Sequence, residues 1–129
     1  MGDKNIVLMF LCFNAVLSQA QDALPKFQFE TKSIKFEKVK AGEILSFNYV
    51  FENTGDKPLI ITNIKVTCDC TKSQWPKEPI NPGVRDTIHV NFNTEGKIGW
   101  QDRILEVYSN ADETPTKLRF KGMVDNKTE

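Results

Sequence analysis

The sequence predicts an all-β protein that folds as a single antiparallel β-sandwich of immunoglobulin-like type, with about seven strands. Three observations support this fold class. Apolar and polar residues alternate with a period of two along most of the chain. Turn-forming residues separate the alternating segments, as in residues 53–58 and 110–115. No segment has the periodicity of an amphipathic helix of three turns, so the strands are expected to connect without helices.

The start of the chain has the features of a secretory signal peptide. Lys4 gives a weakly positive start, and residues 6–17 form an apolar run. Residues 18–20 then place serine and alanine at the −3 and −1 positions of a cut after Ala20. The apolar run is shorter than the roughly 20 residues that a membrane-spanning helix needs. We therefore expect residues 1–20 to be removed, leaving no membrane span in an exported protein of the periplasm, the cell envelope or the medium.

The rest of the chain has the length of one domain. We expect a short linker at residues 21–25, the sandwich at residues 26–125 and a tail at residues 126–129. A domain of this size buries about two-thirds of the surface that its unfolded chain exposes. It can therefore form an apolar core of its own.

Three segments predict strands with a clear inward face. The first inward face is largely aromatic and consists of Leu45, Phe47, Tyr49 and Phe51. The second consists of Ile88, Val90 and Phe92. The last consists of Leu118, Phe120, Gly122 and Val124. Because successive side chains of a strand point to opposite sides of the sheet, each set is expected to face the core.

Other strands are less sharply defined. Residues 27–29 and 34–36 predict one or two short strands. One further strand is expected to turn a single face inward, made of Ile60, Thr62, Ile64, Val66 and Cys68. Residues 103–109 are rich in strand formers, but two inward sets compete there, namely Ile104 with Tyr108 and Leu105 with Val107. Gly96 and Gly99 are interpreted as the turn of a hairpin.

The charge balance argues against two classes of partner. The whole chain has 17 basic and 17 acidic side chains, and residues 1–20 contain one of each sign. The exported chain is therefore also neutral. Nucleic-acid binding normally requires a basic patch, and the sequence shows no block of like charges. We expect neither a nucleic-acid partner nor attachment to a membrane through basic residues.

Cys68 and Cys70 are the residues most able to carry chemistry. Signal cleavage removes Cys12, so the exported chain keeps an even number of cysteines in a compartment that permits disulfides. Residues two apart on a strand have Cα atoms about 6.6 Å apart. This separation is at the upper end of disulfide geometry, so a bond between them needs a local bend. Three interpretations stay open: structural thiols or a bridge, a redox-active pair, and a Cu(I) site formed by Cys68 and Cys70.

The sequence offers no convincing catalytic constellation. His89 is the only histidine, and it falls on the polar face of its strand. Carboxylates near loops are usually exposed to solvent, so those of this chain do not by themselves indicate a catalytic pair. Trp75 and Trp100 lie in segments that the sequence assigns to loops. Trp75 is either a plug over the open end of the sandwich or a contact for a partner, and Trp100 is a possible partner contact. We therefore expect no enzyme, no catalytic residue and no cofactor.

The sequence also resembles a known family of secreted bacterial proteins. The segments that carry the resemblance are residues 53–61 (N-T-G-D-K-P-L-I-I), 68–71 (C-D-C-T), 75–76, 79–83, 90–92 and 109–111. Together they resemble the domain-of-unknown-function family DUF1573, in which glycine usually stands where this chain has Asp69. The resemblance implies an immunoglobulin-like sandwich, similar to PapD or to the major sperm protein, and an exported location. It implies no established reaction.

These observations favour a non-enzymatic binding or structural module of the bacterial cell envelope. Its expected partner is a protein or another envelope component. The alternative is a thiol-redox or Cu(I)-handling protein that uses Cys68 and Cys70. Trp75 and Trp100 are the expected partner contacts under the first interpretation.

The signal-peptide interpretation gives the first testable prediction. Mass spectrometry of the exported protein should find Gln21 as its first residue, because Ala20 ends the expected cleavage motif. Detection of Met1 on a soluble cytoplasmic form would contradict both the compartment and the argument for a disulfide.

Overall fold

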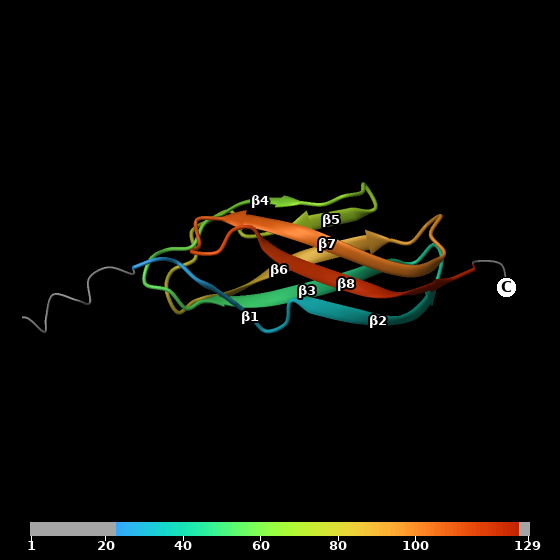
Figure 1. Cartoon of the computed structure of the whole chain (residues 1–129), viewed down its shortest axis with the longest axis horizontal. Helices are drawn as coiled ribbons and strands as arrows, with labels where there is room; N and C mark the ends of the chain where they lie inside the picture. Colours follow the sequence, from blue (N-terminus) through green and yellow to red (C-terminus); the bar gives the residue numbers. More distant parts are fainter. Residues whose placement is uncertain (1–22, 127–129) are drawn as a thin grey trace, which may run out of the picture.

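The computed structural model of the chain describes residues 23–126, which form two four-stranded β-sheets packed face to face (Figure 1). The predicted signal peptide, residues 1–20, lies outside the described residues. The strands are β1 (Phe27–Phe29), β2 (Ser33–Lys40), β3 (Ile44–Asn53), β4 (Ile61–Lys65), β5 (Thr71–Gln74), β6 (Arg85–Asn93), β7 (Gly99–Ser109) and β8 (Thr116–Asp125). Across residues 23–126, no helix is long and apolar enough to span a membrane. The predicted all-β sandwich is confirmed.

Each sheet combines strands from distant parts of the sequence. Sheet A has the order β1-β3-β6-β5, and sheet B has the order β2-β8-β7-β4. Neighbouring strands are antiparallel except for β2 and β8, which are parallel. The expectation of a purely antiparallel sandwich is wrong at this pair. The chain passes from β1 in sheet A to β2 in sheet B through residues 30–32 without reversing, so β2 runs in the direction of β8 (Figure 1).

The sandwich has eight strands in the described residues, where the sequence predicted about seven. The additional strand is β5, whose sequence T-K-S-Q shows no apolar alternation. It forms because its main chain pairs with β6, which places Thr71 opposite Phe92 and Ser73 opposite Val90. Thr71 is buried, so this short polar strand still closes one side of the core.

The predicted inward faces of three strands form the core. In β3, Phe47, Tyr49 and Phe51 are buried. In β6 and β8 the buried residues are Ile88, Val90, Phe92, Leu118, Phe120 and Val124. The Phe120 ring stacks on Phe47 with centroids 4.8 Å apart and lies 5.0 Å from the Phe92 ring. Aromatic rings from both sheets therefore fill the space between them.

The predicted inward face of the fourth strand is wrong at Ile60 and Thr62 but correct at Ile64. Ile60 is 40% exposed and Thr62 is exposed, whereas Ile61 and Ile64 are buried. The register of β4 against β7 shifts between Ile61 and Asn63. Such a bulge adds one residue to a strand, so it reverses the facing of the residues that precede it.

Strand β7 settles the competition between two inward sets. Leu105 and Val107 are buried, whereas Ile104 is 36% exposed. The strand begins at Gly99, so Trp100 lies within a strand and not in the loop that the sequence suggested. The hairpin interpretation of Gly96 and Gly99 is also wrong, because the segment between them connects β6 of sheet A to β7 of sheet B.

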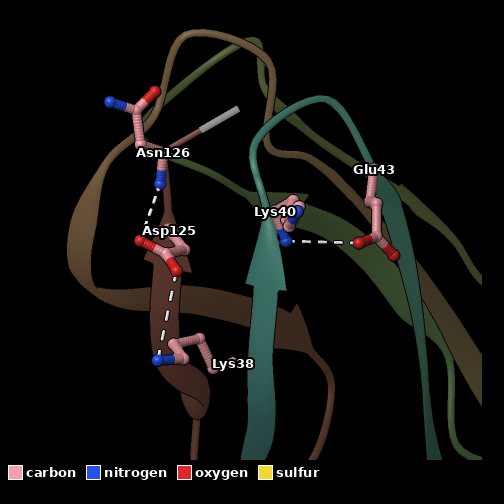
Figure 2. Close-up of polar contacts among 5 residues, drawn as sticks. All are labelled: Lys38, Lys40, Glu43, Asp125 and Asn126. Atoms are coloured by element: carbon pink, nitrogen blue, oxygen red, sulfur yellow. Dashed lines mark hydrogen bonds and ion pairs between the residues drawn. The ribbon is translucent and has the colours of Figure 1, made fainter. Parts of the chain in front are cut away.

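Polar contacts fasten the end of the sandwich at which β2 and β8 finish. The buried Thr94 hydroxyl donates to the Glu43 main-chain oxygen at 2.6 Å and accepts from the Gly42 main-chain N–H at 3.0 Å. Figure 2 shows the neighbouring contacts on the strand ends, where Glu43 accepts from the Lys40 main chain and Asp125 faces Lys38 at 4.0 Å. These hydrogen bonds and ion pairs hold the connecting loops against the strand ends at this end of the sandwich.

The buried side chain of Asn53 organises the opposite end. Its amide nitrogen donates to the main-chain oxygens of Lys57 and Ile80 at 2.8 and 2.9 Å. Its oxygen accepts from the main-chain N–H groups of Gly55 and Lys26 at 2.9 and 3.3 Å. The segment before β1, the turn after β3 and the segment before β6 thus meet at one fully satisfied amide. Such pairing is what a buried polar group needs.

Glycine is required at Gly55, in the turn after β3. A Cβ atom there would collide with the main-chain oxygen of Leu24, which also accepts a hydrogen bond from the Asp56 N–H at 3.1 Å. The segment before β1 therefore packs directly against the backbone of this turn. This close approach explains the N-T-G sequence that follows β3.

The core assignment gives a stability prediction. Phe47 is 8% exposed and stacks on Phe120, so Phe47→Ala should lower the free energy of unfolding by about 3–5 kcal/mol. His89→Ala serves as the control on the outer face of sheet A and should change it by less than about 0.5 kcal/mol. Urea unfolding of both variants measures the difference. Equal and small effects would show that the facing of β3 is misassigned.

Candidate functional site

The structure separates the sequence-predicted site residues into two regions. Cys68, Cys70 and Trp75 lie around β5, at the edge of sheet A. Trp100 lies on β7 and points out of sheet B. The two tryptophans are therefore on different sheets and do not form one surface.

The cysteine pair lies in the connection between β4 and β5. The structure joins Cys68 and Cys70 in a disulfide, with Cα atoms 5.2 Å apart. A turn brings them this close, since the Thr71 N–H donates to the Cys68 main-chain oxygen at 3.2 Å. The Cys70 main-chain oxygen accepts from the Asn93 N–H at 2.8 Å, which attaches the turn to the end of β6.

The surroundings of the two sulfur atoms differ. Both cysteines are partly buried, and Cys70 packs against the apolar core. The Cys70 main-chain N–H donates to the Cys68 sulfur at 3.0 Å. A bridge that closes so short a loop stabilises a fold by only about 1.5 kcal/mol in the chain-entropy model. Within residues 23–126, no group of three or more His, Cys, Asp or Glu residues is arranged to hold a metal ion.

Trp75 covers part of the core beside β5. Its side chain is partly buried and packs against the core cluster. The Lys77 ammonium nitrogen lies 3.2 Å from the centre of its ring, which is a cation–π contact. The Trp75 side chain therefore contacts both the core and Lys77.

Trp100 lies in a more open position, on the outer face of sheet B. Its side chain is 52% exposed and stands opposite Met123 of β8, which is 39% exposed. The two apolar side chains line a shallow groove of about 420 Å³. The other lining residues come from β2 and are Lys35, Phe36, Glu37 and Lys38.

Two further shallow grooves follow on the same face. One has a volume of about 340 Å³ and is lined by Ser33, Ile104, Lys117, Leu118 and Arg119. The next has a volume of about 280 Å³ and is lined by Lys65, Thr67, Ile104, Glu106 and Lys117. Because Ile104 and Lys117 line both, these two grooves adjoin. We call the surface formed by the three grooves the sheet B face.

The sheet B face is predominantly basic. Its basic residues are Lys35, Lys38, Lys65, Lys117 and Arg119. Its acidic residues are Glu37 and Glu106. Arg119 forms an ion pair with Asp102 at 3.0 Å, and Lys38 lies 4.0 Å from Asp125. Charge that balances over the whole chain is therefore unevenly distributed over its surface.

A buried tyrosine connects this face to the core. The Tyr49 hydroxyl of β3 donates to the main-chain oxygen of Arg119 in β8 at 2.6 Å. Burial raises the pKa of Tyr49 far above its ordinary value, so the phenol stays neutral and keeps this hydrogen bond. The bond crosses from sheet A to sheet B directly beneath Arg119.

The outer face of sheet A has a different character. His89 is exposed there, and its Nδ1 atom lies 2.7 Å from the side-chain oxygen of Asn48. Ser46 donates to Asn91 at 2.7 Å in the same pair of strands. His89 thus belongs to a group of polar side chains on β3 and β6, away from both cysteines and from Trp100.

Sequence reasoning identified Trp100 but missed the other residues of the sheet B face. Lys35, Ile104 and Met123 belong to three different strands, which become neighbours only through the pairing of β2, β8 and β7. One signal was present in the sequence. Met123 is an apolar residue in the outward phase of β8, which otherwise turns charged residues outward.

Comparison with known families places the chain. Residues 27–124 match the family described as "Protein of unknown function (DUF1573)". The chain belongs to this family, and the resemblance found in the sequence is confirmed. Among curated proteins, none matches the chain.

Solved structures show the same fold at low sequence identity. PapD-like domain 7 of human CEP192, an ASH/PapD-like domain, has a TM-score of 0.61 at 13% identity, covering 86% of this chain and 93% of that one. A Porphyromonas gingivalis W83 protein of unknown function has a TM-score of 0.68 at 13% identity, covering 84% of this chain and 51% of its own. The secreted serine protease VesC from Vibrio cholerae has a TM-score of 0.57 at 13% identity, covering 88% of this chain and 25% of that one. The chain therefore spans about half of the second protein and a quarter of the third. These similarities establish a PapD-like, immunoglobulin-like sandwich.

Proposed function

We propose that this protein is an exported, non-enzymatic binding module of the bacterial cell envelope, which uses the sheet B face. The sequence supports export through the signal-peptide features of residues 1–20. The observation that carries the binding function is the exposed Trp100 in a groove whose walls include Lys35 and Lys38. A half-exposed tryptophan beside Met123 and lysines has the composition of a recognition surface.

The lining of the sheet B face is suited to binding and not to catalysis. Its two carboxylates, Glu37 and Glu106, line different grooves, so they do not form the close pair that acid–base chemistry uses. The remaining side chains are chiefly basic, aliphatic or aromatic, and they can attract and pack against a partner. The rigid strands β7 and β8 hold them at fixed spacing.

A site-specific photo-crosslinker tests this proposal in the producing cells. Benzoylphenylalanine at position 100 should form adducts with an envelope component, because this position is in the proposed contact. The matched control carries benzoylphenylalanine in place of His89, on the outer face of sheet A. It should form few adducts. Equal labelling from the two positions, or labelling only from position 89, would contradict the use of the sheet B face.

The cysteine pair supports a second candidate, a thiol-redox or Cu(I)-handling protein. The observation that favours it is the hydrogen bond from the Cys70 main-chain N–H to the Cys68 sulfur. After reduction of the disulfide, the same donor would stabilise a thiolate at Cys68. Two thiolates of this kind suit Cu(I).

Alkylation and copper titration separate the two candidates. In a binding module, the reduced native protein should react slowly with iodoacetamide and hold no stoichiometric copper. The double variant Cys68→Ser, Cys70→Ser should then give the same crosslinking from position 100 as the parent. Fast alkylation of Cys68, or one tightly held Cu(I) per chain, would favour the thiol function instead.

A further inference from the structure

We infer that the sheet B face binds an acidic polysaccharide. This inference rests on the proposed function and names the chemical class of its partner. Three properties of the face carry it: the sign of its charge, the state of the main chain beneath it, and the spacing of its apolar side chains.

Charge complementarity sets the sign of the partner. Basic side chains outnumber acidic ones on the sheet B face, and the lysines come from β2, from β8 and from the end of β4. The ion pairs of the described residues leave Lys35, Lys65 and Lys117 without a carboxylate within 4.0 Å. Ammonium groups spread over the face in this way attract a chain that carries anionic groups at intervals.

The main chain under the grooves favours a glycan over a peptide. Strand β8 pairs with β2 on one side and β7 on the other, and β7 also pairs with β4. The backbone N–H and C=O groups of these central strands are therefore already used. An extended peptide usually gains affinity by adding a strand to a free sheet edge, whereas β7 and β8, which carry Trp100, Ile104 and Lys117, are central strands. A partner that lies over these two strands is recognised by side chains alone.

The apolar side chains are spaced for an extended partner. Trp100 and Ile104 point out of the same face of β7 and are four residues apart, which is about 13 Å along a strand. This distance exceeds the width of one sugar ring. The apolar C–H face of a sugar can pack on the Trp100 ring while its carboxylates reach the lysines. Both residues lie on strands and line hollows, whereas insertion into a lipid surface would need them on a protruding loop.

Binding measurements with defined polyanions test the inference. Calorimetric titration of the purified protein with polygalacturonate should show binding that weakens as salt is added, and dextran should not bind. Trp100→Ala should weaken polygalacturonate binding at least about tenfold. The double variant Lys35→Glu, Lys117→Glu should weaken it by a similar factor.

Matched variants on sheet A control for general effects. Ile44→Ala removes an apolar residue that is 65% exposed on β3, and Lys72→Glu reverses an exposed charge on β5. Both should leave the affinity for polygalacturonate unchanged. Unchanged thermal unfolding of all four variants would show that the losses arise at the binding surface.

Two results would overturn the inference in distinguishable ways. Binding to poly-L-glutamate or to phosphatidylglycerol vesicles that depends on Trp100 and exceeds polygalacturonate binding would keep the sheet B face as a site but replace the glycan. Absence of Trp100-dependent binding to all three probes would overturn the glycan inference. If this absence of binding were combined with equal crosslinking from positions 100 and 89, the proposed function would be contradicted as well.

Discussion

The layer of apolar side chains between the two sheets is the constraint on which the rest of the structure depends. Phe47 of sheet A and Phe120 of sheet B stack within it, and Phe92 packs on the same ring. Because side chains alternate along a strand, each residue fixed inward also fixes its neighbours outward. In β7, the burial of Leu105 and Val107 therefore determines that Trp100 and Ile104 face solvent. The candidate binding surface is thus a geometric consequence of how the core packs.

The sequence predicted well those strands that bury one unbroken face. The alternation in β3, β6 and β8 is strict, because each is central in its sheet and packs on the opposite sheet along its length. Prediction from the sequence failed where tertiary contacts override the local pattern. The bulge in β4 reverses the facing of Ile60 and Ile61, and no residue type in that segment predicts a bulge. Strand β5 exists only because β6 offers a free edge to pair with.

The candidate site was predictable only in part, and the reason is spatial. An exposed tryptophan can be suspected from sequence, and Trp100 was, although it was assigned to a loop. Its neighbours Lys35 and Met123 are separated from it by long stretches of chain and by the unexpected parallel pairing of β2 with β8. Cys68 and Cys70 are the reverse case. Their spacing was evident, whereas the turn that brings their Cα atoms to 5.2 Å depends on contacts with Asn93 in β6.

The edge strands of the two sheets have a consequence for how the molecule behaves in concentrated surroundings. Exposed strand edges invite pairing with other chains, which leads to aggregation. Here β2 carries lysines along its edge and changes register between Phe36 and Val39, while the edges β1 and β5 are only three and four residues long. The fourth edge, β4, is bulged. Each open border of the sandwich is therefore too short, too irregular or too charged to serve as a template for a neighbouring strand.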